Sequence, residues 1–147
     1  LHDERGFVDG PAEGPALLDR PLRPIDDNYE MAAALLDLHA LTGVDRYREA
    51  GRDAIAAFAG ARDRMGVQVA GYGSVAARLV GPTLRIEVGA PAGSDLHRAA
   101  LRVGDHEKVV VPAVEALDGT ARVIVGETAS DPVATPRGLA DRVAEMV

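Results

Sequence analysis

The chain has 147 residues, which is enough for one domain or two small subdomains with a sizeable buried core. Hydrophobic residues make up 47% of it and aromatic residues only 3%, so Ala, Val and Leu must build that core. The absence of cysteine excludes disulfides, zinc–thiolate sites and thiol catalysis within the chain. A formal charge of -7 argues against a nucleic-acid partner, because phosphate binding needs clustered positive charge.

The sequence also bears on where the protein works. No apolar run approaches the roughly 20 residues that span a bilayer, and the first residues, LHDERGF, lack the apolar core of a signal peptide. We therefore predict a soluble, cytoplasmic protein with no membrane partner. Because the chain starts at Leu1 and not at Met, we expect it to be a fragment of a longer protein. Lys108 is the sole lysine beside fifteen arginines, and this acidic, lysine-poor composition is consistent with a salt-loving organism.

The N-terminal residues 1–16 are polar and rich in Gly and Pro, and residues 6–10 are their candidate for a short strand and turn. Residues 17–20 could form a second short strand. Pro21 and Pro24 then disfavour helix in the residues that precede them. We expect an extended arm here.

The longest predicted helix follows this arm. Asp27 is placed to cap it, and Glu30, three residues later, completes a pattern like a capping box. An apolar stripe at helical spacing indicates a core-facing helix. Its members are Met31, Leu35 and Leu38, widened by Leu36 and Leu41. Gly43 is the expected C-terminal stop.

Two further helices are predicted in the first half. Asp45 would cap a helix that ends at Gly60, and the short link at residues 42–44 favours an antiparallel hairpin. One face of this helix is apolar, formed by Tyr47, Ala50, Ala54, Ile55 and Phe58. A third helix is predicted over residues 63–80. Its glycines, Gly66, Gly71 and Gly73, suggest that another backbone packs closely against it.

After Gly81-Pro82 the apolar period changes from 3.6 to 2. Residues 84–88 are predicted to form a strand with one solvent-exposed (wet) face. Residues 109–111 are predicted to form a strand buried on both faces, and residues 121–125 a third strand. Ser94 is placed to cap a helix over residues 95–103. Thr135 and Pro136 are placed to start a last helix, whose inner stripe is Leu139, Val143 and Met146.

These patterns predict an α+β protein. Residues 1–81 form the extended arm and antiparallel helical hairpins, and residues 82–147 form a small α/β layer of about three strands.

Several short motifs, in order along most of the chain, resemble the C-terminal part of the YyaL-like family, the thioredoxin-domain-containing relatives of spermatogenesis-associated protein. They lie at residues 6–9, 18–24, 27–28 and 38–43, at Tyr47 and Ala50, and at residues 126–128, 131–133 and 135–136. The resemblance implies that residues 1–81 belong to a six-hairpin (α/α)6 toroid, followed by a small α/β region. It also implies a longer parent whose thioredoxin module lies outside this chain.

The chain departs from the family at two points. Relatives usually follow Asp-Asn with a Pro-Ser-x-Asn segment, whereas here Tyr29-Glu30-Met31 continues into the helix. Relatives often carry a cysteine where Ala129 stands.

Polar residues around the start of the first helix are the candidate substrate-binding set. They are Asp9, Arg20, Arg23, Asp27, Asn28 and Glu30. Carboxylates and planar donors of this kind can hydrogen-bond to sugar hydroxyls. A pair of carboxylates can also act as general acid and base in glycoside chemistry. Helix capping by Asp27 and Glu30 is the alternative interpretation, and capping alone accounts for both acids.

Other candidates are weaker. The turn at residues 89–93 follows a strand and precedes a helix, but it lacks the spacing and the Lys-Ser/Thr ending of a phosphate loop. His97, Asp105, His106 and Glu107 lack the spacing of a helical zinc motif. His39 reads as a hydrogen-bonded helix residue. Ser74 and Ser94 have no nucleophile signature. We predict no metal and no cofactor.

Three functions follow from these observations. The first is a non-catalytic or catalytically incomplete C-terminal portion of a YyaL-like protein that completes a toroid. In this interpretation its partner is the missing part of the parent or a second copy of the chain. The second is part of a carbohydrate-active epimerase- or glycosidase-like enzyme, with a sugar bound near Asp27. The third is a regulatory small-molecule binder that uses the turn at residues 89–93.

Overall fold

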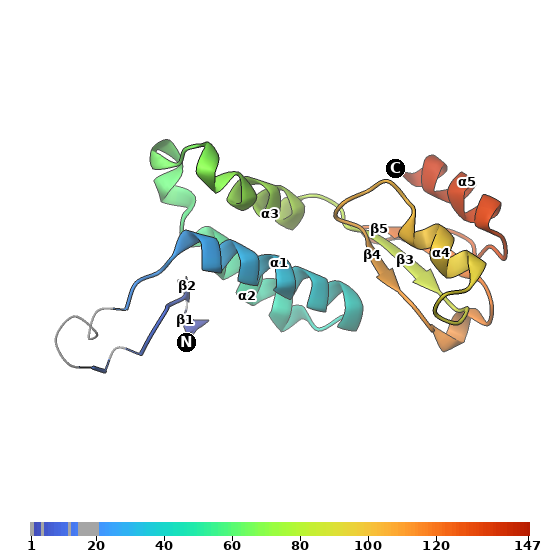
Figure 1. Ribbon diagram of the computed structural model, residues 1–147, viewed down its shortest axis with the longest axis horizontal. Coiled ribbons are helices and arrows are strands. Elements are labelled where there is room, and N and C mark those ends of the chain that lie inside the picture. The colour runs from blue at the N-terminus through green and yellow to red at the C-terminus, as the bar shows by residue number, and fades with distance from the viewer. Residues whose placement is uncertain (1, 4, 12, 15–20) are drawn as a thin grey trace. The chain divides into compact units, whose positions relative to one another are not determined.

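A change of backbone pattern at Gly81–Pro82 divides the chain into two compact units, Leu1–Gly81 and Pro82–Val147. The structure is a computed structural model, and it describes residues 2–3, 5–11, 13–14 and 21–147. The strand predicted over residues 17–20 and the candidate Arg20 lie outside the described residues. The first unit is mainly helical and the second combines helices with a sheet (Figure 1), so the predicted α+β class is confirmed.

Two helices form the centre of the first unit. Helix α1 (Ile25–Thr42) and helix α2 (Asp45–Ala56) lie side by side in Figure 1, joined by Gly43 and Val44. Gly43 adopts a left-handed conformation with φ 70°, and its N–H donates to the His39 carbonyl. That geometry favours glycine, so the predicted stop is confirmed.

The predicted caps of these two helices are wrong. Helix α1 begins at Ile25, directly after Pro24, and Asp27 lies within its first turn. Pro24 already has the extended conformation that an N-cap needs, so the helix can start there. Helix α2 begins at Asp45 itself, after Val44. The acids therefore act through the helix dipole in the first turn, without a capping hydrogen bond.

The predicted inner stripe of α1 is also wrong, except at Leu36, which is buried as predicted. The residues that α1 buries are Asn28, Ala32, Leu36 and Ala40, spaced four apart. Met31, Leu38 and Leu41 are 44%, 41% and 47% exposed. The small side chains of Ala32 and Ala40 allow neighbouring helices to approach closely. Leu36 is the only leucine or methionine of α1 among the buried residues. The buried cluster of this unit is Ala32, Leu36, Ala54, Ile55 and Val75.

The third helix is shorter than predicted. Helix α2 ends at Ala56, short of Gly60, and two 3-10 segments, η2 (Ala59–Arg64) and η3 (Val67–Val69), precede helix α3 (Ala70–Val80). Glycines weaken regular helix at these points. Close packing is found at Gly71, where an added Cβ would lie 2.6 Å from the Tyr29 ring. The neighbour is thus a side chain and not the backbone that we predicted.

A two-stranded ribbon precedes the helices. Strand β1 (His2–Asp3) pairs antiparallel with strand β2 (Gly6–Phe7). The second strand contacts both α1 and α2.

The second unit is a helix layer on a four-stranded sheet. Its strands are β3 (Leu84–Val88), β4 (Val109–Val111), β5 (Ala121–Val125) and β6 (Thr128–Ala129), in the order β4-β3-β5-β6. Strand β3 runs parallel to β4 and antiparallel to β5. Helices α4 (Asp95–Leu101) and α5 (Pro136–Met146) cover one face of the sheet (Figure 1), and a short 3-10 segment, η4 (Glu115–Leu117), precedes β5.

The helix starts of this unit match the sequence prediction. The Ser94 side chain accepts from the His97 N–H at 3.2 Å, and the Thr135 hydroxyl accepts from the Gly138 N–H at 3.1 Å. Pro136 is in the first turn of α5. Leu139 is 1% exposed, and Val143 and Met146 pack on the same core. Helix α4 ends at Leu101, two residues earlier than predicted.

Two predictions about the sheet are wrong. Strand β4 lies at an edge, so Val110 and Val111 are half-buried and not enclosed on both faces. The predicted wet face of β3 contains Glu87, which is only 8% exposed. Arg85 and Arg122 cover its carboxylate at 2.9 Å and 2.7 Å. Two guanidiniums on one carboxylate explain how a charged residue can lie buried on the sheet.

Candidate functional site

Asn28, one of the predicted site residues, holds the ribbon against helix α1. Its Oδ1 accepts from the Phe7 N–H at 2.7 Å, and its Nδ2 donates to the carbonyls of Phe7 and Pro24 at 2.9 Å and 2.8 Å. The side chain is fully buried. Gly6 is required beside it, because an added Cβ would lie 2.6 Å from Oδ1. The carboxamide thus pairs with a backbone edge as a neighbouring strand would.

Two more predicted site residues bind backbone atoms of the arm. The Asp9 carboxylate accepts from the Leu22 N–H at 2.7 Å, and the Asp9 N–H donates to the Leu22 carbonyl at 3.0 Å. The Arg23 guanidinium donates to the Arg5 carbonyl at 2.6 Å. These contacts give Asp9 and Arg23 a structural role in joining residues 5–9 to the segment that leads into α1.

Asp27 and Glu30 are exposed on the first turns of α1. Neither makes a cap hydrogen bond. The structure brings Asn28, Asp9 and Arg23 into one hydrogen-bonded entry to the helix and leaves the two carboxylates facing solvent. A carbohydrate-active function for the chain therefore remains a hypothesis that is based on the resemblance.

The other sequence candidates have local contacts. His97 Nδ1 accepts from the Gly93 N–H at 3.0 Å, which ties the turn at residues 89–93 to α4. His39 Nδ1 lies 3.3 Å from the Val44 carbonyl. Over the described part of the chain, no group of three or more His, Asp or Glu side chains is placed to hold a metal ion.

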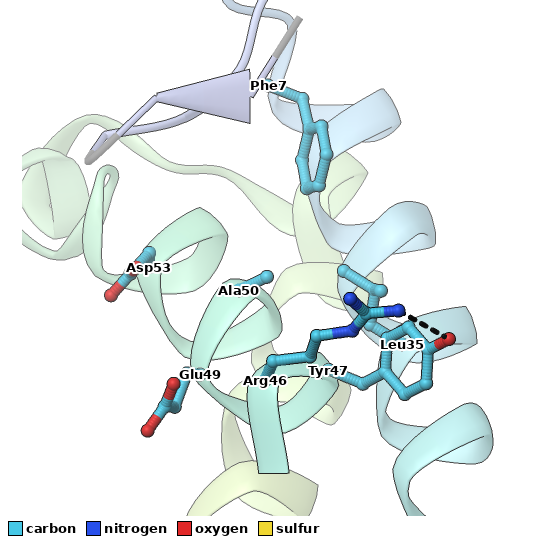
Figure 2. Close-up of a pocket in the computed structure, with 7 residues that line it drawn as sticks. All are labelled: Phe7, Leu35, Arg46, Tyr47, Glu49, Ala50 and Asp53. Carbon is cyan, nitrogen blue, oxygen red and sulfur yellow. Dashed lines mark hydrogen bonds between the residues drawn. The ribbon is translucent and has the colours of Figure 1, made fainter. Parts of the chain in front are cut away.

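A shallow groove opens between β2, α1 and α2, with a volume of about 420 Å³. Its lining is mostly apolar, from Phe7, Leu35, Tyr47 and Ala50. Figure 2 shows the Phe7 ring pointing toward Leu35, with Tyr47 beside Leu35 at the other end. Sequence reasoning placed Leu35, Tyr47 and Ala50 on inner faces and did not identify this groove.

Charged side chains border the groove along α2. Glu49 and Asp53 extend from the side of α2 that faces away from α1 (Figure 2). Arg46 lies over the Tyr47 ring, 5.2 Å from its centroid, and reaches the Tyr47 hydroxyl at 3.5 Å. This places Arg46 in a cation–π contact with its neighbour on α2, beside the groove.

The groove adjoins the outward stripe of α1, which we call the α1 face. It consists of Met31, Leu35, Leu38 and Leu41, at spacings of four, three and three residues. At about 100° per residue these positions fall within an arc of about 120°. Leu35 belongs to both the groove and the stripe. The signal that could have found this face is the pairing of one alanine-rich stripe with one leucine-rich stripe on the same helix.

Two of the three half-buried tyrosines of this unit, Tyr29 and Tyr72, have raised pKa values. Burial, reinforced by the nearby charges of Asp26 and Glu30, raises the pKa of Tyr29 above its ordinary 10.0. Burial also raises the pKa of Tyr72, whose hydroxyl donates to the Ile55 carbonyl at 2.9 Å. Both hydroxyls are neutral at physiological pH and serve packing.

Comparisons with protein families, with curated proteins and with solved structures found no match to this chain. Within the described residues, no helix has both the length and the apolar character needed to cross a membrane.

Proposed function

We propose that the chain is the C-terminal portion of a YyaL-like protein, and that its helical unit is a structural interaction module that completes a larger helical assembly. The observation that carries this proposal is the exposed α1 face on the longest helix of the unit. Leucine and methionine side chains in a continuous stripe are the usual contact surface between packed helices. A contiguous apolar surface of this kind marks an interaction site.

The support comes from a contrast within one helix. Helix α1 buries Asn28, Ala32, Leu36 and Ala40 against its own unit and leaves Met31, Leu38 and Leu41 more than 40% exposed. A helix of an isolated domain normally has the opposite arrangement. The α1 face therefore fits a surface that a helix from outside the 147 residues covers, as the neighbouring hairpin of a toroid would.

The first test measures whether the α1 face binds an apolar dye or causes self-association in the isolated chain. The neutral dye Nile red suits an acidic protein, because charge does not repel it. We expect dye fluorescence to rise with the wild-type chain, or the chain to self-associate in light scattering. Leu38→Glu should abolish either effect. Leu101→Glu is the matched control, because Leu101 is 53% exposed on α4 of the other unit. A monomer that binds no dye would remove the basis of the proposal.

The second test concerns parentage. The genomic reading frame that contains this chain should encode a thioredoxin-like segment upstream of Leu1. An upstream segment of another kind would contradict the YyaL-like assignment. It would not affect the proposal that the helical unit is an interaction module.

A further inference from the structure

The α1 face and the groove form one continuous surface, joined at Leu35. Met31 lies toward the N-terminal end of α1, Leu38 and Leu41 toward its C-terminal end, and Tyr47, Ala50 and Phe7 extend the surface sideways onto α2 and β2. A surface of this form has a ridge of leucines beside a shallow apolar trough. Another helix fits such a shape, because its side chains can fill the trough while its ridge lies against the leucines.

The border of this surface is acidic. Glu49 and Asp53 stand along the α2 side, four residues apart on one helix, where like charges repel weakly. Asp27 is exposed one turn before Met31, at the N-terminal end of the stripe. Arg46 contributes positive charge but is engaged with Tyr47. Arg52 Nε lies 3.9 Å from Asp53, which is a surface pair of little strength.

Resting on the proposed function, we infer that the partner of this surface is an amphipathic helix with aliphatic residues on one face and Lys or Arg along its flank. The aliphatic residues pack on the α1 face and fill the groove, and the basic flank lies against Glu49 and Asp53. Such charges contribute to orientation and to the rate of association.

The same charges argue against two other occupants. A second copy of the chain would bring its own acidic border against this one, in a molecule of formal charge -7. An anionic lipid surface attracts amphipathic helices with a basic polar face, which is the opposite of this border.

The test uses the whole 147-residue chain and two synthetic helical peptides of the same length as α1. Both carry leucines at heptad a and d positions. One has lysines at the flanking e and g positions and the other has glutamates there. Binding is measured by the fluorescence anisotropy of the labelled peptide at low and moderate ionic strength.

We expect the lysine-flanked peptide to bind at least about tenfold more tightly than the glutamate-flanked one. Added salt should reduce that ratio. Leu38→Glu should abolish binding, and the matched Leu101→Glu variant should retain it. The double variant Glu49→Lys/Asp53→Lys should shift the preference toward the glutamate-flanked peptide. A lysine-flanked peptide with a central proline should lose binding, because it cannot form the helix.

Several results would overturn the inference. Equal binding of the two peptides, or binding that Leu38→Glu leaves unchanged, excludes a basic helix at this surface. Tighter binding to phosphatidylglycerol vesicles than to the peptide indicates a membrane surface, and a dimer that Leu38→Glu dissociates indicates a second copy. If Nile red detects the α1 face but the peptides bind equally, the charge argument fails while the proposed function stands. If neither dye nor peptide responds to Leu38→Glu, both fail.

Discussion

The two units of this chain differ in the burial of the larger apolar side chains of their helices. In the α/β unit, Leu139 of α5 and Leu96 of α4 are buried against the sheet, and Leu101 at the end of α4 is exposed. An ion cluster around Glu87 lies on the other face of β3 and β5. In the helical unit, α1 buries one leucine, Leu36, beside two alanines, and leaves Met31, Leu38 and Leu41 exposed. The exposed leucine of α4 stands alone on its helix, whereas Met31, Leu38 and Leu41 form a stripe along α1.

The distribution of aromatic residues makes this comparison measurable. All three tyrosines and both phenylalanines lie within residues 1–81, and the chain has no tryptophan. Tyrosine fluorescence therefore reports on the helical unit alone, while far-ultraviolet circular dichroism reports on both units.

Truncation of an equivalent leucine in each unit should give the largest contrast. Leu139→Ala opens a cavity in a core where the side chain is 1% exposed, and should cost about 2–5 kcal/mol of unfolding free energy. Leu38→Ala, on the α1 face, should cost less than about 1 kcal/mol. Urea unfolding followed by both signals measures each value. Equal losses in the two variants would show that Leu38 is part of a core.

The Asn28 contact should be the next most sensitive point. Asn28→Asp keeps the shape but replaces two donated hydrogen bonds by repulsion between the carboxylate and the carbonyls of Phe7 and Pro24. We expect a loss of about 2–3 kcal/mol in the tyrosine-detected transition. Glu30→Gln, an exposed change two residues away on the same helix, is the control and should stay within about 0.5 kcal/mol of wild type. Equal stabilities of Asn28→Asp and the control would show that the Asn28 carboxamide does not stabilise the unit.

The ion cluster offers a smaller test of the α/β unit. Glu87→Gln removes the charge that Arg85 and Arg122 share, and should cost about 1–2 kcal/mol, because both arginines are partly exposed. The loss should be visible in circular dichroism and leave the tyrosine transition unchanged. The matched control is Glu127→Gln, at an exposed position of the same unit. A shift of the tyrosine signal in Glu87→Gln would mean that the two units do not unfold separately.

The tyrosine hydroxyls should make the helical unit sensitive to alkaline pH. Burial raises the pKa of Tyr72 above 10.0, so the folded state holds its proton more tightly than the unfolded chain does. The resulting stability is complete below pH 10 and is lost as pH rises through the folded-state pKa. Tyr72→Phe should flatten that part of the pH profile, which urea unfolding at a series of alkaline pH values measures. An unchanged slope would assign the alkaline loss to other groups.

Much of the α/β unit could be predicted from sequence because its signals are local. Ser94, Thr135 and Pro136 define helix starts through their own chemistry, and alternation at residues 84–88 identifies a strand. The position of β4 at the edge of the sheet was not predictable, because three valines look alike at an edge and at a centre. The burial of Glu87 depends on Arg122, which is distant in sequence and adjacent through strand pairing.

The helical unit was less predictable for a different reason. Helix α1 is apolar on two sides, so periodicity alone could not decide which stripe faces the core. The choice depends on close approach by α2 and α3, which the small side chains of Ala32 and Ala40 permit on either side of Leu36. Asn28 could be identified from the sequence only as a polar residue near a helix start. Its three contacts with Phe7 and Pro24 arise from a ribbon that is itself formed by a few residues.

The central claim is that the α1 face is covered in the protein's natural setting. The chain contains no cysteine, so Leu38→Cys and Leu101→Cys each introduce one labelling site in it. Maleimide labelling rates, mapped by mass spectrometry, should be similar at the two sites in the isolated chain. In the natural gene product isolated under native conditions, we predict that labelling at position 38 slows at least about tenfold while labelling at position 101 does not change. Equal labelling of both sites in the natural gene product would contradict the account.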